Sequence, residues 1–177
     1  MKFYPKVRSG DPENIEAQAA RYYWRRLMGE DFRRDTNGGG LNAPLNYGYT
    51  VVRSAVARAV VGAGLSAGLG LHHRARLNAF QLVDDLIEPF RPLVDFLVWQ
   101  NRDAWQAGLL GPEEKGRLAD IINFPMKTEQ GLFPMYRVAF QISNSLAKIY
   151  MGEEKVFAFP KDWARARQEE FCFGDET

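Results

Sequence analysis

Prolines divide this sequence into short helical segments, and their spacing constrains the fold more than any other feature. Proline suits the first turn of a helix, because the N–H group that it lacks would have no helical partner there. The prolines at or near the start of a predicted helix are Pro12, Pro44, Pro92, Pro112 and Pro134. Between them there is no sustained alternation of apolar and polar residues, which a half-buried strand would show. The sequence therefore predicts an all-α fold, a multi-helix bundle-like domain.

The predicted helices make up one domain over residues 11–152, preceded by a lead-in segment over 1–10 and followed by a charged tail over 153–177. Asn42 and Asn78 each precede a helical segment, so we expect both to act as N-caps. Hydrophobic residues make up 46% of the 177 residues, which is enough for a packed core and too many for a disordered chain. The expected helices cover residues 11–28, 42–61, 78–88, 92–106, 112 onward and 134 onward.

Charge is distributed unevenly along the chain, although the net charge is only +1. Residues 1–91 carry 13 Lys and Arg against 9 Asp and Glu, whereas residues 92–177 carry 10 against 13. The first half could therefore present a basic face to an anionic partner such as nucleic acid. Random scatter of charges explains the same difference equally well.

Cysteine content and hydropathy favour a cytoplasmic protein without membrane contact. Cys172 is the single cysteine, so no internal disulfide can form and a reducing compartment is expected. Residues Met1–Gly10 contain no apolar run of the kind that a signal peptide needs. The most apolar stretch, Val51–Leu71, contains Arg53 and Arg58, which favours a buried helix over a membrane span.

A cluster of acids, Asp84, Asp85 and Glu88, follows the two histidines of the chain, His72 and His73. Spacings of three and four positions place all three carboxylates near one face of a helix. Their apolar neighbours indicate a buried helix, in which adjacent carboxylates repel one another and lose their hydration. A divalent cation would relieve both costs. Oxygen-rich ligands with one imidazole suit Mg²⁺ or Mn²⁺ better than Zn²⁺.

A further acid, Glu16, shares a helical stripe with Ala20, Tyr23 and Leu27. Because the apolar members of such a stripe face the core, we expect Glu16 to face inward as well. The alternative is that the acids are solvated surface charges and that His73 is an ordinary surface residue after a turn. No P-loop, dinucleotide-binding fingerprint, nucleophile elbow or zinc motif is present.

Three blocks of the sequence, taken in order, resemble a known family. Ser9–Gly29 places a glutamate ahead of an Ala-Ala-x-x-Tyr helix, Leu41–Val61 contains Leu-Asn-Tyr-Gly-Tyr, and Leu69–Asp95 carries the histidines and the acid cluster. Together they resemble the C-terminal catalytic domain of the CRISPR adaptation integrase and endonuclease, the CRISPR-associated protein 1 family. The doubled histidine and the run Asp-Leu-Ile-Glu-Pro-Phe-Arg-Pro are most similar to the version that accompanies single-effector, type II systems.

This resemblance implies a metal-dependent DNA endonuclease and integrase, which inserts short DNA fragments (spacers) into a CRISPR array by transesterification. It implies that Mg²⁺ or Mn²⁺ is the cofactor, with Asp85 as a supporting acid and Asp84 and His72 as neighbours of the site. The implied catalytic residues, which are also the implied metal ligands, are Glu16, His73 and Glu88. The candidate DNA contacts are Arg21, Arg25, Arg26, Arg74 and Arg76, although each alone could be a solvated surface charge.

The family carries an N-terminal β-rich domain before the matched segment, and this chain opens almost directly on the catalytic helix. We therefore expect the chain to lack that domain. The resemblance implies CRISPR-associated protein 2 as a partner in the adaptation complex, and a homodimer that loss of the domain would weaken. Two alternative functions remain open: a non-catalytic DNA-binding remnant of an integrase, and the integrase of a mobile element that shares this domain.

Overall fold

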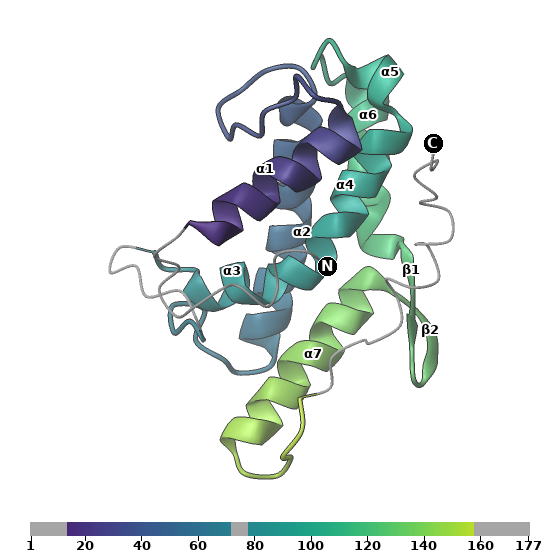
Figure 1. The fold of residues 1–177 in the computed structure, drawn as a ribbon. Coiled ribbons are helices and arrows are strands. Elements are labelled where there is room, and N and C mark those ends of the chain that lie inside the picture. The colour runs from purple at the N-terminus through teal and green to yellow at the C-terminus, as the bar shows by residue number, and fades with distance from the viewer. Residues whose placement is uncertain (1–13, 72–77, 158–177) are drawn as a thin grey trace.

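The computed structural model describes residues 14–71 and 78–157, which fold into helices and one short hairpin (Figure 1). The α-helices are α1 (Ile15–Met28), α2 (Asn42–Gly62), α3 (Gln81–Ile87), α4 (Arg91–Gln100), α5 (Arg102–Trp105), α6 (Pro112–Ala119) and α7 (Met135–Tyr150). Two 3₁₀ turns, η2 (Glu88–Phe90) and η3 (Asp120–Asn123), and two strands, β1 (Pro125–Thr128) and β2 (Gly131–Pro134), complete the described part. The predicted all-α class is confirmed.

Helix α2 is the centre of the described structure, because α3, α4, α6 and α7 all pack against it. Its buried face consists of apolar side chains at helical spacing, each at most 1% exposed: Leu45, Val52, Val56, Ala59 and Val60. The apolar segment around these residues is therefore a buried helix, as predicted. Within the described ranges, no helix combines the length and the apolar character needed to cross a membrane.

Gly48 allows α2 to approach α4 closely. A Cβ atom at this position would lie 2.5 Å from Cγ1 of Val94 on α4 and 3.3 Å from Cδ2 of Leu118 on α6. Real Cβ contacts are not this short, so any larger residue would push the helices apart. The absence of a side chain at position 48 thus allows α2 and α4 to pack this closely.

The predicted N-cap role of Asn42 is wrong. Asn42 is the first residue of α2, it is buried, and the cap position belongs to Leu41. Its Oδ1 atom accepts hydrogen bonds from the Arg34 side chain at 3.0 Å and from the backbone N–H of Asp35 at 2.9 Å. Because the side chain binds the preceding loop, it is not used to cap its own helix.

The helix predicted over 92–106 is broken in the structure. Helix α4 ends at Gln100, and the side-chain amide of Asn101 donates to the carbonyl of Leu97 at 2.8 Å. An asparagine side chain that competes for a helical carbonyl in this way favours termination of the helix. The short helix α5 follows as a separate element.

The hairpin of β1 and β2 was not predicted. The strands are four residues each and pair antiparallel, with Thr128 opposite Gly131 and Glu129 and Gln130 in the connection. Four residues are too few for alternation to be recognised, and Glu-Gln lacks the Asn-Gly signal of tight hairpins. Gly131 adopts φ 121°, a conformation that favours glycine.

We expect Gly48→Ala to lower the free energy of unfolding by about 1–2 kcal/mol, because overpacking against Val94 outweighs the helical preference for alanine. Gly116→Ala on α6 is the matched control, since a Cβ atom there meets nothing within 4 Å. It should instead raise the free energy of unfolding by up to about 1 kcal/mol. Urea denaturation followed by circular dichroism measures both changes, and equal effects of the two variants would contradict the close packing.

Candidate functional site

Two acids of the predicted cluster, the proposed ligand Glu88 and its neighbour Asp84, lie along one wall of an open cavity. This cavity has a volume of about 480 Å³ and is lined by α2, the α3–η2 segment and residues that precede α2. Asp84 and Glu88 line it together with three arginines, Arg34, Arg53 and Arg91. Its wall therefore offers guanidinium groups for an anion next to carboxylates that can hold a cation.

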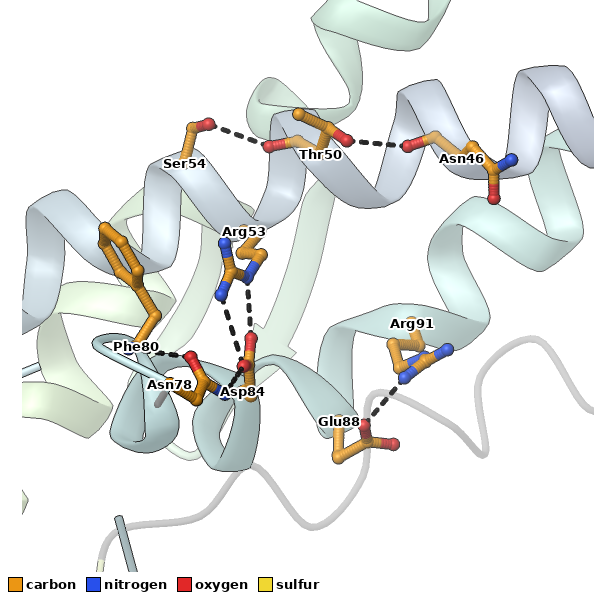
Figure 2. A network of polar contacts seen from close by, with 9 residues as sticks. All are labelled: Asn46, Thr50, Arg53, Ser54, Asn78, Phe80, Asp84, Glu88 and Arg91. Carbon is orange, nitrogen blue, oxygen red and sulfur yellow. Dashed lines mark hydrogen bonds and ion pairs between the residues drawn. The ribbon is translucent and has the colours of Figure 1, made fainter. Parts of the chain in front are cut away.

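Asp84 joins α3 to α2 through Arg53. The Nε and Nη2 atoms of Arg53 donate to its two carboxylate oxygens at 2.6 and 3.2 Å, and the Asn78 side-chain amide donates at 2.7 Å (Figure 2). The hydrogen bond to Asp84 raises the pKa of Arg53, whose guanidinium lies 4.8 Å from the ring centroid of Phe80. Asn78 also accepts the N–H of Phe80, so it closes the turn before α3 instead of occupying the predicted N-cap position.

Glu88 lies on η2 with its side chain 56% exposed, and its Oε1 atom accepts a hydrogen bond from Arg91 at 2.9 Å (Figure 2). Ion pairs that are this exposed contribute only about 0–1 kcal/mol, so Glu88 can exchange Arg91 for another cation at little cost. The guanidinium of Arg91 also lies 4.6 Å from the ring centroid of Tyr49. This contact holds Arg91 at the cavity independently of Glu88.

Asp85 holds the chain at the point where the predicted histidine segment begins. Its Oδ2 atom accepts the backbone N–H of Leu71 at 2.6 Å. Residues 72–77 follow directly, and they lie outside the described residues, together with the predicted site residues His73, Arg74 and Arg76 and the neighbouring His72. A carboxylate that positions the start of this segment is consistent with a supporting role for Asp85.

Glu16 lies in the first turn of α1 and is exposed, so the expectation that it faces inward is wrong. Ala20 and Tyr23 of the same stripe are exposed as well, and only Leu27 is buried. The stripe is buried only near the C-terminal end of α1, where Trp24 lies beside Leu27 in the core. Exposure leaves the Glu16 carboxylate accessible to a ligand.

Within residues 14–71 and 78–157, no group of three histidine, cysteine or acidic side chains is placed to hold a metal ion. The predicted set requires His73, which lies outside these ranges. The two predicted carboxylate donors, Glu16 and Glu88, are both accessible, and carboxylate oxygens are the donors that Mg²⁺ and Mn²⁺ prefer. These donors fit such an ion chemically, and the complete site stays a prediction.

The predicted DNA contacts on α1 line a second, smaller cavity of about 300 Å³. Arg21, Arg25 and Arg26 are all exposed there. Arg25 lies 3.9 Å from the carboxylate of Glu30, and the ring of Tyr22 completes the wall. Exposed guanidinium groups beside an aromatic ring suit the phosphates and bases of a nucleic acid strand.

Asp95 is a buried carboxylate that the sequence reasoning missed. It lies on α4, is 4% exposed, and accepts one hydroxyl from Tyr23 of α1 at 2.7 Å and another from Tyr49 of α2. Burial raises the pKa of Asp95 to about 6, although both hydrogen bonds and the charges of Arg91 and Arg34 act in the opposite direction. Burial around the hydroxyl groups also raises the pKa of both tyrosines, although much of the Tyr23 residue is exposed, so each hydroxyl keeps its proton to donate.

A charged residue within an otherwise apolar run, residues 93–98, was the one signal that could have identified Asp95. The cavity arginines Arg34, Arg53 and Arg91 were also missed. Arg53 and its partner Asp84 are 31 positions apart, and no local pattern reveals such a pair.

The sequence matches a known protein family and several curated proteins. The family model described as CRISPR associated protein Cas1 matches residues 13–110, more than half of the chain. Over 93 residues the chain is 54% identical to the CRISPR-associated endonuclease Cas1 of Neisseria meningitidis, covering 52% of this chain and 30% of that protein. Over 112 residues it is 35% identical to a CRISPR-associated endonuclease Cas1 of Pyrobaculum aerophilum, covering 60% of this chain and 38% of that protein. The chain thus spans about a third of the length of these curated relatives.

The fold is also similar to a solved structure, a casposase bound to integration product. The TM-score is 0.70, the sequence identity is 21%, and the match covers 97% of this chain and 62% of the casposase chain. Similarity at this identity shows a shared fold.

We expect acid to stabilise the protein through Asp95. Because the folded-state pKa is raised from 3.8 to about 6, the proton that Asp95 binds stabilises the fold fully below about pH 4, and this stabilisation is lost as the pH rises through 6. Relative to Asp95→Asn, the unfolding free energy of the parent should be about 2 kcal/mol greater at about pH 4.5 than at about pH 7.5. Urea denaturation at both pH values measures this difference. Relative to Asp103→Asn, at a side chain that is 92% exposed, the parent should show no such difference between the two pH values, because this control variant keeps Asp95.

Proposed function

Because the chain belongs to the Cas1 family, we propose that it is the catalytic part of a metal-dependent DNA endonuclease and integrase that inserts short DNA fragments into a CRISPR array. The observation that carries this proposal is the accessible carboxylate of Glu88 in a cavity lined by three arginines. A carboxylate can hold a cation that polarises a phosphate, and guanidinium groups can bind the phosphate itself, so both suit metal-dependent phosphodiester chemistry. The similarity to proteins named as Cas1 endonucleases supports the same assignment.

In the proposed reaction, the 3′-hydroxyl of a short DNA fragment attacks a phosphodiester of the target strand. A bond forms between that oxygen and phosphorus, the bond to the target strand's own 3′ oxygen breaks, and the displaced oxygen takes up a proton. Mg²⁺ or Mn²⁺ held by Glu16, His73 and Glu88 would supply Lewis-acid stabilisation of the charge on the reacting phosphate.

The chain's own arginines would hold the strand. When Glu88 takes up another cation, Arg91 keeps its contact with Tyr49 and turns its donors to a phosphate. Arg53 is oriented by Asp84 on the same cavity wall and provides a second guanidinium. Holding the phosphate between fixed donors brings the reacting atoms into line.

The exposed arginines of α1 extend this surface, and we propose that Arg21, Arg25 and Arg26 contact the DNA backbone, with Arg74 and Arg76 as further contacts. CRISPR-associated protein 2 and a second copy of the chain are the proposed protein partners. A second candidate function is DNA binding without cleavage, which the arginine-lined cavities could perform without a cation. The two functions differ in their dependence on metal.

We expect Glu16→Ala and Glu88→Ala each to abolish Mn²⁺-dependent cleavage of branched DNA, because each removes one ligand of the proposed ion. Since both side chains are exposed, the melting temperature should change little. Glu113→Ala is the matched control, because its side chain is 76% exposed on α6 and pairs only with the nearby Arg117 among the ion pairs described. Wild-type activity in either site variant would remove that residue from the site, and metal-independent binding by an inert parent would favour the second function.

We expect affinity for duplex DNA to fall as salt rises. If about four phosphates are neutralised, log affinity should fall against log salt with a slope of roughly −3.6. Arg21→Gln and Arg25→Gln should each make the slope shallower by about 0.9, whereas Arg117→Gln on α6 should leave it unchanged. Fluorescence anisotropy at several salt concentrations measures the slopes, and salt-independent binding would contradict the proposed surface.

A further inference from the structure

One buried carboxylate connects the helix that carries Glu16 with the helix that follows Glu88. Asp95 of α4 accepts the hydroxyl of Tyr23 from α1 at 2.7 Å and the hydroxyl of Tyr49 from α2 with its other oxygen. A buried carboxylate costs free energy that an apolar side chain of similar size would not cost. Packing alone therefore does not account for an acid at this position.

Each glutamate is separated by the same number of residues from the residue of its own helical segment that takes part in the Tyr23–Asp95 hydrogen bond. Tyr23 follows Glu16 by seven residues, and Asp95 follows Glu88 by seven residues. Seven residues make almost two turns, so such pairs project from one face and lie about 10 Å apart along a helix. In the second pair, η2 leads directly into α4, so Glu88 and Asp95 lie on one nearly continuous helical path.

Whether this equal spacing brings Glu16 and Glu88 close together depends on the relative direction of α1 and α4. Figure 1 shows α1 and α4 rising in roughly the same direction, from the end of the molecule near α3 toward α5. Glu16 and Glu88 therefore both lie on the α3 side of the Tyr23–Asp95 hydrogen bond. If the helices were antiparallel, the same bond would separate the two glutamates by about 20 Å.

We propose that Asp95 is a positioning residue, whose hydrogen bond with Tyr23 sets the register of α1 against α4 and so places Glu16 opposite Glu88. A slip of α1 by one turn would move Glu16 by about 5 Å, more than the distance between a metal ion and its ligand. The bond with Tyr49 holds the Asp95 carboxylate from the other side. The inference rests on the proposed function, in which both glutamates act at one site.

The first test uses the full 177-residue chain with Tyr23→Phe, which removes the hydroxyl and keeps the ring beside Trp24. The maximal single-turnover rate of cleavage of branched DNA with Mn²⁺ should fall about tenfold, while the half-saturating DNA concentration changes less than about twofold. Asp95→Asn should act in the same direction, and the double variant should be no slower than the slower single variant. Tyr150→Phe, at an exposed tyrosine that ends α7, should behave as the parent.

A second measurement follows the register without relying on activity. Nitroxide labels at Ala20→Cys on α1 and Gln100→Cys on α4, both exposed positions, are placed in a Cys172→Ser background. The parent should give one narrow distance distribution, and Tyr23→Phe should shift or broaden it.

Two outcomes would overturn the positioning role. One is a parental rate together with a parental distance distribution in Tyr23→Phe. The other is a rate that falls only in proportion to the folded fraction while the distribution stays unchanged, since this would mean that the bond serves stability alone. A parent that cleaves no DNA would count against the proposed function, and the label distances would still decide the register.

Discussion

The close packing of α2 against α4 at Gly48 is the constraint on which the arrangement of the site depends. Gly48 precedes Tyr49, and Val94, its contact on α4, precedes Asp95. The approach that leaves no room for a Cβ atom at position 48 is therefore the approach that brings the Tyr49 hydroxyl to the Asp95 carboxylate. Apolar packing and the buried polar network cannot change independently here, because adjacent residues on the same two helices make both.

The acids of the cavity differ in how firmly each is held, although they lie only four positions apart. Asp84 accepts two hydrogen bonds from Arg53 and one from Asn78 among the described residues. The one ion pair described for Glu88 is with Arg91, and both side chains are partly exposed. Local pairing thus makes Asp84 a structural link and leaves Glu88 able to change partner. It also explains why a net charge of +1 reveals little, since Arg53 and Arg91 of the cavity are paired with Asp84 and Glu88.

Much of the fold could be predicted from the sequence, because prolines and glycines mark helix boundaries through local backbone chemistry. One physical cause of the failures is that tertiary contacts override local preference. Asn42 has the composition of a cap but binds the preceding loop. The site could be predicted only in part for the same reason: Glu88 lies on the cavity wall as the acid cluster suggested, whereas burial of Asp95 depends on tyrosines of two other helices. The exposure of Glu16 was not predicted, because hydrophobic periodicity identifies a helix face and cannot show whether another element covers that face.

The attachment of α1 has a mechanical consequence. Trp24 and Leu27 lie in the hydrophobic core cluster and Tyr23 is hydrogen-bonded near one end of this helix, while Glu16 lies almost two turns away, next to Ile15, which is buried but outside that cluster. The intervening segment acts as a lever arm of about 10 Å, so a tilt of about 10° around Tyr23 would swing Glu16 by about 2 Å. Displacements of about 1 Å can slow an enzymatic reaction by two orders of magnitude. A molecule that bound the exposed face of α1 and tilted the helix slightly would therefore lower or adjust the reaction rate without touching the cavity.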